Sequence, residues 1–130
     1  MSDGTGLILV IDDHEDSREM VSALLELSGY STHGAENGAE ALAALRGGLR
    51  PVLIILDWLM PGMDGATFLD ELRRAPEFAP IPVIVVSASV ALNTNRPGTH
   101  VLVKPVLPDV LLERVNALCG ADAGTGGKAP

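Results

Sequence analysis

The chain has 130 residues, the size of one compact domain, and 47% of them are hydrophobic while only 3% are aromatic. Its formal net charge is −8 and it has no Lys/Arg cluster, which argues against nucleic acid as a partner, because phosphate backbones attract such clusters. The single cysteine, Cys119, excludes an internal disulfide, and we expect it to be a small buried side chain. We expect no membrane contact and a cytoplasmic location, because no apolar run approaches the roughly 20 residues of a membrane span and no hydrophobic leader precedes the first predicted strand.

The first part of the chain alternates an aliphatic run with a segment of helical spacing. Residues 1–6 are polar and Gly-rich, and we expect them to be flexible. The aliphatic run at 7–11 is typical of a strand covered on both faces. A helix is predicted at 15–28, and a short outer strand at 30–34. The residues that share one face of this helix are Met20, Val21, Leu24, Leu25 and Ser28.

The next segments repeat the alternation. Asn37 has the position of an N-cap, with Glu40 three residues later as in a capping box, and this helix should end at the glycine pair 47–48. Residues 51–56 form a second aliphatic strand, which ends at Asp57.

A loop at 60–65 then precedes an amphipathic helix at 66–75. The side chains expected to be buried in this helix are Phe68, Leu69 and Leu72. Those expected to face solvent are Asp70, Glu71, Arg73 and Arg74.

The last segments complete five strand–helix alternations. Aliphatic strands are predicted at 82–86 and 101–103, and a final helix at about 108–119. Residues 120–130 are Ala/Gly-rich and predict a flexible tail. Such an alternation predicts an α/β fold, with a parallel sheet between two helix layers, in a single domain at 7–119.

Polar side chains follow the strands of this predicted sheet. Ligands of open parallel α/β sheets bind outside the carboxyl ends of the strands. The side chains at those positions are Asp12, Asp13, Asp57, Ser87 and Lys104. Three clustered carboxylates require a compensating cation, and hard oxygen ligands suit Mg²⁺. Asp57 could then attack phosphorus to form an acyl phosphate, while Ser87 and Lys104 bind phosphoryl oxygens.

Over about residues 7–119 the chain resembles the receiver (CheY-like) domain of response regulators. The elements that carry the resemblance are Asp12-Asp13, Asp57, the Met-Pro-Gly-Met-Asp-Gly loop at 60–65, Ser87 and Lys104-Pro105. The resemblance implies a doubly wound, flavodoxin-like (β/α)5 three-layer sandwich with strand order 2-1-3-4-5. It also implies two-component phosphorelay signalling, in which a sensor histidine kinase or a histidine phosphotransfer domain phosphorylates Asp57.

The same resemblance implies a role for each site residue. Asp13, Asp57 and the backbone carbonyl of Leu59 would bind Mg²⁺, with Asp12 acting largely through water. Ser87 would move toward the phosphoryl group, and Lys104 would pair with it. The domain would be a switch, not an enzyme with a separate substrate, and would catalyse only its own phosphoryl transfer and dephosphorylation. Its downstream partner is left open, and receivers of this kind often form phosphorylation-dependent homodimers through the fourth helix, fifth strand and fifth helix.

The sequence departs from the family pattern in the second half of the chain. Many members carry Tyr or Phe three residues before the lysine, where this chain has Val101, which has no ring to rotate inward. The segment between Ser87 and Lys104 is shorter than typical and rich in poor helix formers, so we predict a shortened or irregular, mobile fourth helix at 88–98. We also expect the apolar Leu59 to slow hydrolysis of the aspartyl phosphate.

Two other functions can be compared with this interpretation. An aspartate-nucleophile phosphatase on a similar sheet needs a second aspartate two residues after the nucleophile, and Leu59 stands there. A nucleotide or flavin binder needs a Gly-rich or Ser/Thr-rich loop after the first strand, and the acidic residues at 12–16 would repel phosphate.

The remaining polar and aromatic candidates are interpreted as structural. The histidines lack metal-ligand spacing and are expected on the surface or in packing contacts, although His14 is close enough in sequence to tune access to the site. The sole tryptophan, Trp58, is expected to be a partly exposed packing residue that could report metal or phosphate by fluorescence.

Overall fold

The computed structural model describes residues 6–58, 65–87 and 98–120. The strands are β1 (Leu7–Ile11), β2 (Ser31–Ala35), β3 (Leu53–Asp57), β4 (Val83–Ser87) and β5 (Thr99–Val103). The helices are α1 (Glu15–Leu27), α2 (Gly38–Arg46), α3 (Gly65–Arg74) and α4 (Pro108–Val115), which continues into a π-helical turn at Asn116–Gly120.

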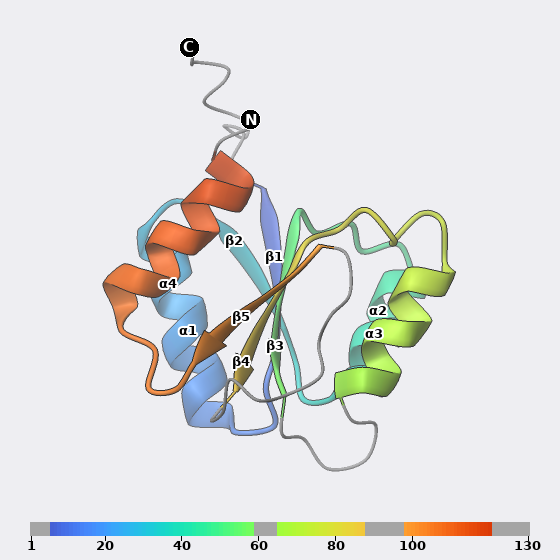
Figure 1. The fold of residues 1–130 in the computed structure, drawn as a ribbon, viewed down its shortest axis with the longest axis horizontal. Coiled ribbons are helices and arrows are strands. Elements are labelled where there is room, and N and C mark those ends of the chain that lie inside the picture. Colours follow the sequence, from blue (N-terminus) through green and yellow to red (C-terminus); the bar gives the residue numbers. More distant parts are fainter. Residues whose placement is uncertain (1–5, 59–64, 88–97, 121–130) are drawn as a thin grey trace.

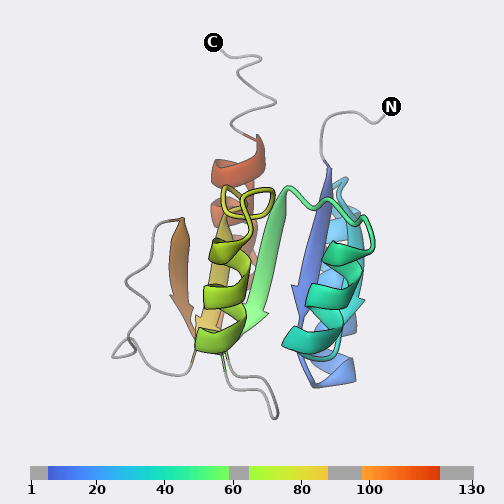
Figure 2. The ribbon, with the colours of Figure 1, turned by 90° about the vertical axis from the view of Figure 1, so that its right-hand side faces the viewer.

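The five strands form one parallel sheet in the order β2-β1-β3-β4-β5, which confirms the predicted order. Helices α1 and α4 cover one face of the sheet, and α2 and α3 cover the other (Figures 1 and 2). The chain leaves β1 in one direction to β2 and returns past it to β3, so the topological switch lies between β1 and β3. In doubly wound sheets, ligands bind beside this switch, at the carboxyl ends of the strands.

The aliphatic strands build the core on both faces of the sheet. Because successive strand residues point to opposite faces, Ile8 and Val10 pack among the residues of α1 and α4, whereas Leu9 and Ile11 pack among those of α2 and α3. All four are at most 1% exposed. Each such side chain contributes roughly 1.5–3 kcal/mol by leaving water, so the strand ends are held in a stiff frame.

The N-terminus of α2 has the predicted cap. The Asn37 side chain accepts a hydrogen bond from the Glu40 backbone N–H at 2.8 Å. The Glu40 carboxylate in turn accepts from the backbone N–H of Glu36, one residue earlier than in a standard capping box.

The helical pattern predicts that Arg73 faces solvent, and this prediction is wrong. Its guanidinium is half-buried and donates hydrogen bonds to the backbone carbonyls of Ala79 and Ile81, at 2.8 Å each, and of Gly98 at 3.3 Å. Burial lowers the pKa of Arg73. The reason is that carbonyls in the connection after α3 lack strand or helix partners, and the forked donor of an arginine can satisfy several of them at once.

The helical pattern predicts that Met20 lies in the core. This prediction is wrong, since the Met20 side chain is 71% exposed. Leu25 is the only fully buried residue among those of α1. Helix α1 thus contacts the sheet along a narrow stripe, and its other apolar residues line a depression beside α4. Cys119 is buried near the end of the π-helical turn, as predicted.

Several predictions fall on residues outside the described ranges. These are the irregular fourth helix, of which only Gly98 is described, the loop residues 59–64 with Leu59, and most of both flexible ends. In the described ranges, no helix combines the length and the apolarity that crossing a membrane would need.

Candidate functional site

The predicted site residues meet at one edge of the sheet. Asp12 directly follows β1, Asp57 and Ser87 are the last residues of β3 and β4, and Lys104 directly follows β5. Asp57 lies opposite Val86 in the strand register, so Ser87 lies one residue beyond the position opposite Asp57. Because the strands are parallel, all four residues reach the same edge, as the sequence predicts.

Asp57 is a buried carboxylate with a cation beside it. It is 5% exposed, and its Oδ1 accepts a hydrogen bond from the Lys104 ammonium group at 3.2 Å. The Lys104 backbone N–H is fixed by a 2.7 Å hydrogen bond to the Ser87 carbonyl, while its side chain stays 43% exposed. The backbone of Lys104 is therefore fixed beside β4, while its partly exposed side chain reaches Asp57.

Asp12 is held in place by three hydrogen bonds, the first of which its backbone N–H donates to the Ala35 carbonyl at 3.0 Å. Its Oδ1 accepts from the His14 backbone N–H at 2.9 Å, and its backbone carbonyl accepts from Arg18 Nη1 at 2.8 Å. Burial raises the pKa of the Asp12 carboxyl, and the nearby charges of Asp57 and Asp13 act in the same direction, whereas the hydrogen bond from His14 opposes the rise. The fold thus places negative charge where desolvation and repulsion disfavour it.

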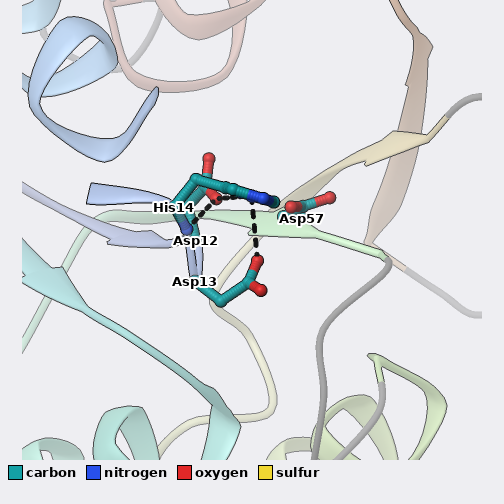
Figure 3. A group of neighbouring side chains, drawn as sticks. All are labelled: Asp12, Asp13, His14 and Asp57. Carbon is teal, nitrogen blue, oxygen red and sulfur yellow. Dashed lines mark hydrogen bonds and ion pairs between the residues drawn. The ribbon is translucent and has the colours of Figure 1, made fainter. Parts of the chain in front are cut away.

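Asp13 has an oxygen that the protein leaves unsatisfied. Its buried Oδ1 takes part in no hydrogen bond within the described structure, although His14 Nδ1 lies 3.3 Å away as an ion-pair partner. Figure 3 shows the His14 imidazole between Asp12 and Asp13, and its Nδ1 is 3.6 Å from Asp12 Oδ1. One ligand atom from each of Asp12, Asp13, His14 and Asp57 lies within 4.8 Å of the others. Grouped carboxylates with an orphaned oxygen fit a divalent cation.

His14 was not among the predicted site residues. Histidine spacing along the chain carries no metal-site signal here, and what brings the imidazole to the carboxylates is the turn between β1 and α1. The only available clue in the sequence is that His14 directly follows the acidic pair.

An open cleft of about 510 Å³ lies over these residues. The side chains that line it are Asp12, His14, Ser17, Val21, Asp57, Val86, Lys104, Pro105 and Val106. The cleft is wide enough for a phosphoryl group and a hydrated cation, and its polar groups converge on Asp57.

Two neighbours of the site have apolar roles. Trp58 directly follows Asp57, is half-buried and packs against the core cluster of α2 and α3. Val101 is likewise partly buried against this cluster, where many receivers carry an aromatic ring. Trp58 is therefore a packing residue next to the acceptor, as predicted.

Comparison with known proteins identifies the family. The family model described as "Response regulator receiver domain" matches residues 8–116. The chain is 34% identical over 116 residues to the phosphate regulon transcriptional regulatory protein PhoB of Pseudomonas aeruginosa. The aligned residues cover 85% of this chain and 50% of that protein. The chain thus spans about half the length of the curated relatives it matches.

Solved structures agree with this match. The chemotaxis protein CheY4 of Vibrio cholerae superposes with a TM-score of 0.80 at 29% identity, covering 88% of this chain and 98% of that one. The receiver domain of a signal transduction histidine kinase from Syntrophus aciditrophicus gives a TM-score of 0.79 at 31% identity, covering 96% and 98%. These likenesses favour phosphorelay signalling over a phosphatase-type hydrolase. The chain belongs to the response regulator receiver domain family, the phospho-accepting switches of two-component systems.

Proposed function

We propose that this chain accepts a phosphoryl group on Asp57 from the phosphohistidine of a cytoplasmic sensor histidine kinase or histidine phosphotransfer domain, and that the aspartyl phosphate switches the binding of a downstream protein. The observation that carries the proposal is the position of Asp57. It is 5% exposed at a strand end, 3.2 Å from the Lys104 ammonium group and grouped with Asp12 and Asp13.

The reaction assigns a task to each side chain. A carboxylate oxygen of Asp57 attacks phosphorus, the P–N bond breaks with its electron pair passing to that nitrogen, and the donor leaves as neutral imidazole that keeps the proton on its other ring nitrogen. Lys104 turns from the carboxylate to a phosphoryl oxygen, and Ser87 donates its hydroxyl to another. Asp12, Asp13 and Asp57 would hold Mg²⁺, which neutralises charge on the phosphoryl oxygens when bound. The Leu59 carbonyl, the fourth ligand that we expect, lies outside the described residues.

The same residues would catalyse loss of the phosphoryl group. The cleft over Asp57 is open, so water has access to a phosphoryl group held there. We expect Leu59 to slow this attack.

An apolar surface next to the cleft supports docking of a protein phosphodonor. A depression of about 330 Å³ between α1 and α4 shares Val21, Val86 and Val106 with the cleft. The exposed large apolar side chains at α1 and at the start of α4 are Met20, Leu27, Leu107 and Val110. Exposed apolar groups that adjoin a reactive carboxylate favour a protein partner over a small-molecule substrate. A phosphorylation-dependent homodimer stays a proposal too, because the expected surface includes residues 88–97, which lie outside the described ranges.

The proposal is tested by Mg²⁺-dependent labelling with a small phosphodonor such as acetyl phosphate. We expect the parent to gain one phosphoryl group by intact mass, in a form that hydroxylamine cleaves, and Asp57→Asn to gain none. Asp70→Asn, an exposed aspartate of α3, is the matched control and should label like the parent. Undiminished labelling of Asp57→Asn would remove Asp57 from the acceptor role.

A further inference from the structure

We infer that His14 is a direct ligand for a first-row transition ion such as Zn²⁺ at the acidic site, and that such an ion competes there with Mg²⁺. This inference rests on the proposed function, because it assumes that the cluster of Asp12, Asp13 and Asp57 is the divalent-cation site. It concerns His14, the fourth side chain of the group, which offers a nitrogen ligand and has no role in a site built from oxygen ligands alone.

The geometry supports a shared ion. Atoms that bind one ion at about 2.0–2.2 Å are at most roughly 4.4 Å apart, so a group whose ligand atoms lie within 4.8 Å of one another needs only a small contraction to hold one ion. His14 Nδ1 already lies 3.3 Å from Asp13 Oδ1 and 3.6 Å from Asp12 Oδ1. Figure 3 shows the His14 imidazole directed toward the carboxylates, with dashed lines to those of Asp12 and Asp13.

The exposure of the His14 side chain makes that contraction inexpensive in free energy. The His14 side chain is 73% exposed and precedes α1 without packing in either core cluster. Its backbone, in contrast, is tied by the hydrogen bond from its N–H to Asp12 Oδ1. The ring can therefore turn about a fixed base, and removal of the ring leaves the fold intact.

Ligand chemistry then decides which ion gains from His14. Three carboxylates alone suit hard ions such as Mg²⁺, which keeps oxygen ligands and water. An imidazole nitrogen suits Zn²⁺, Ni²⁺ and Cu²⁺. Loss of the imidazole should thus weaken the binding of transition ions and leave the binding of Mg²⁺ nearly unchanged.

Calorimetric titration of the folded chain with Zn²⁺ and, separately, with Mg²⁺ tests this prediction. We expect His14→Ala to weaken Zn²⁺ binding at least about tenfold. Loss of even an outer-shell partner of a metal ligand costs about tenfold or more in metal affinity, so loss of a direct ligand should cost no less. Mg²⁺ binding should change less than twofold. His33→Ala removes an exposed imidazole from β2 and is the matched control, which should bind both ions like the parent. Asp13→Asn should weaken both ions. Equal thermal melting of His14→Ala and the parent checks that the variant is folded.

A spectroscopic measurement separates coordination from a simple ion pair. With Cu²⁺ as the probe, electron paramagnetic resonance should show nitrogen hyperfine coupling in the parent and in His33→Ala, and lose it in His14→Ala. Unchanged Zn²⁺ affinity in His14→Ala, an equal loss in His33→Ala, or the absence of nitrogen coupling in the parent would each overturn the inference. If instead the parent binds no Mg²⁺ while Zn²⁺ binding depends on His14, the inference about His14 holds and the proposed Mg²⁺-dependent function fails.

Discussion

At the scale of single residues, the acceptor Asp57 has both a positive charge and negative charges as close neighbours. Asp57 has the Lys104 ammonium group 3.2 Å from its Oδ1, and it is grouped with the carboxylates of Asp12 and Asp13. Removing one partner of a buried ion pair is usually costly, because the other charge is left uncompensated. Here the Lys104 side chain is 43% exposed, so the lysine can leave Asp57 for a phosphoryl oxygen at lower cost than a fully buried cation could.

This arrangement of charges predicts opposite effects of Lys104→Met on metal binding and on phosphorylation. Mg²⁺ binding should be as tight as in the parent or tighter, because a competing cation is gone. The rate of labelling by acetyl phosphate should fall about 100-fold, the usual loss when one electrostatic stabiliser of a transition state is removed. Calorimetry and mass spectrometry on the same preparation measure both quantities, with Lys104→Arg as the charge-preserving control. A parallel loss of both would indicate that Lys104 only holds the loop in place.

At the scale of elements, the site depends on how β3 is joined to α3. Trp58 follows the acceptor and packs on Gly65, the first residue of α3. A Cβ atom at position 65 would lie 2.5 Å from Trp58 Cε3, which is closer than real contacts allow. The glycine therefore leaves room for the indole ring at the start of α3.

Gly65→Ala should displace the Trp58 ring. We expect the free energy of unfolding to fall by about 1–3 kcal/mol, as in other overpacked sites, and the tryptophan emission maximum to shift. Urea denaturation followed by fluorescence measures both. Gly47→Ala, at the C-cap of α2 where φ is −82°, is the matched control and should leave the emission unchanged. An unshifted spectrum and unchanged stability in Gly65→Ala would show that the ring moves freely.

At the scale of the whole molecule, folding stability depends on pH through groups that burial perturbs. His100 lies on β5, and burial lowers its pKa below the ordinary value of 6.5, with the positive charge of Arg114 acting in the same direction. Protonation of this imidazole is thus disfavoured in the folded state. Between the lowered pKa and 6.5, the unfolded chain binds more protons than the folded one, so stability rises with pH in this window.

The contribution of His100 should be fully present above pH 6.5 and lost as the pH falls through the lowered pKa. In His100→Asn we expect a flatter dependence of the free energy of unfolding on pH just below 6.5 than in the parent. Urea titrations at several pH values measure this dependence, and His33→Asn, which changes an exposed histidine, should keep the slope of the parent. Identical slopes in the parent and His100→Asn would contradict the assignment.

Much of the fold and of the site could be predicted because both depend on local patterns. Continuous aliphatic runs identify strands buried on two faces, as the complete burial of Ile8, Leu9 and Ile54 confirms. The order of Asp12, Asp57, Ser87 and Lys104 along the chain was enough to bring them together, because parallel strands all end at one edge of a sheet. The sequence by itself thus determined the layers of the molecule and the oxygen and amine groups of its site.

Only the tertiary structure decided what depends on the neighbours of each side chain. Arg73 is drawn inward because its guanidinium donates to the carbonyls of Ala79 and Ile81 after α3 and of Gly98 before β5, which no helical pattern shows. Met20 is exposed because α1 and α4 leave a depression between them. His14 joins the acidic cluster because the turn after β1 places its imidazole over Asp12 and Asp13. In each case the deciding contact joins groups whose distance in space is set by packing and by the path of a turn, whereas sequence periodicity reports only which face of its own element a side chain occupies.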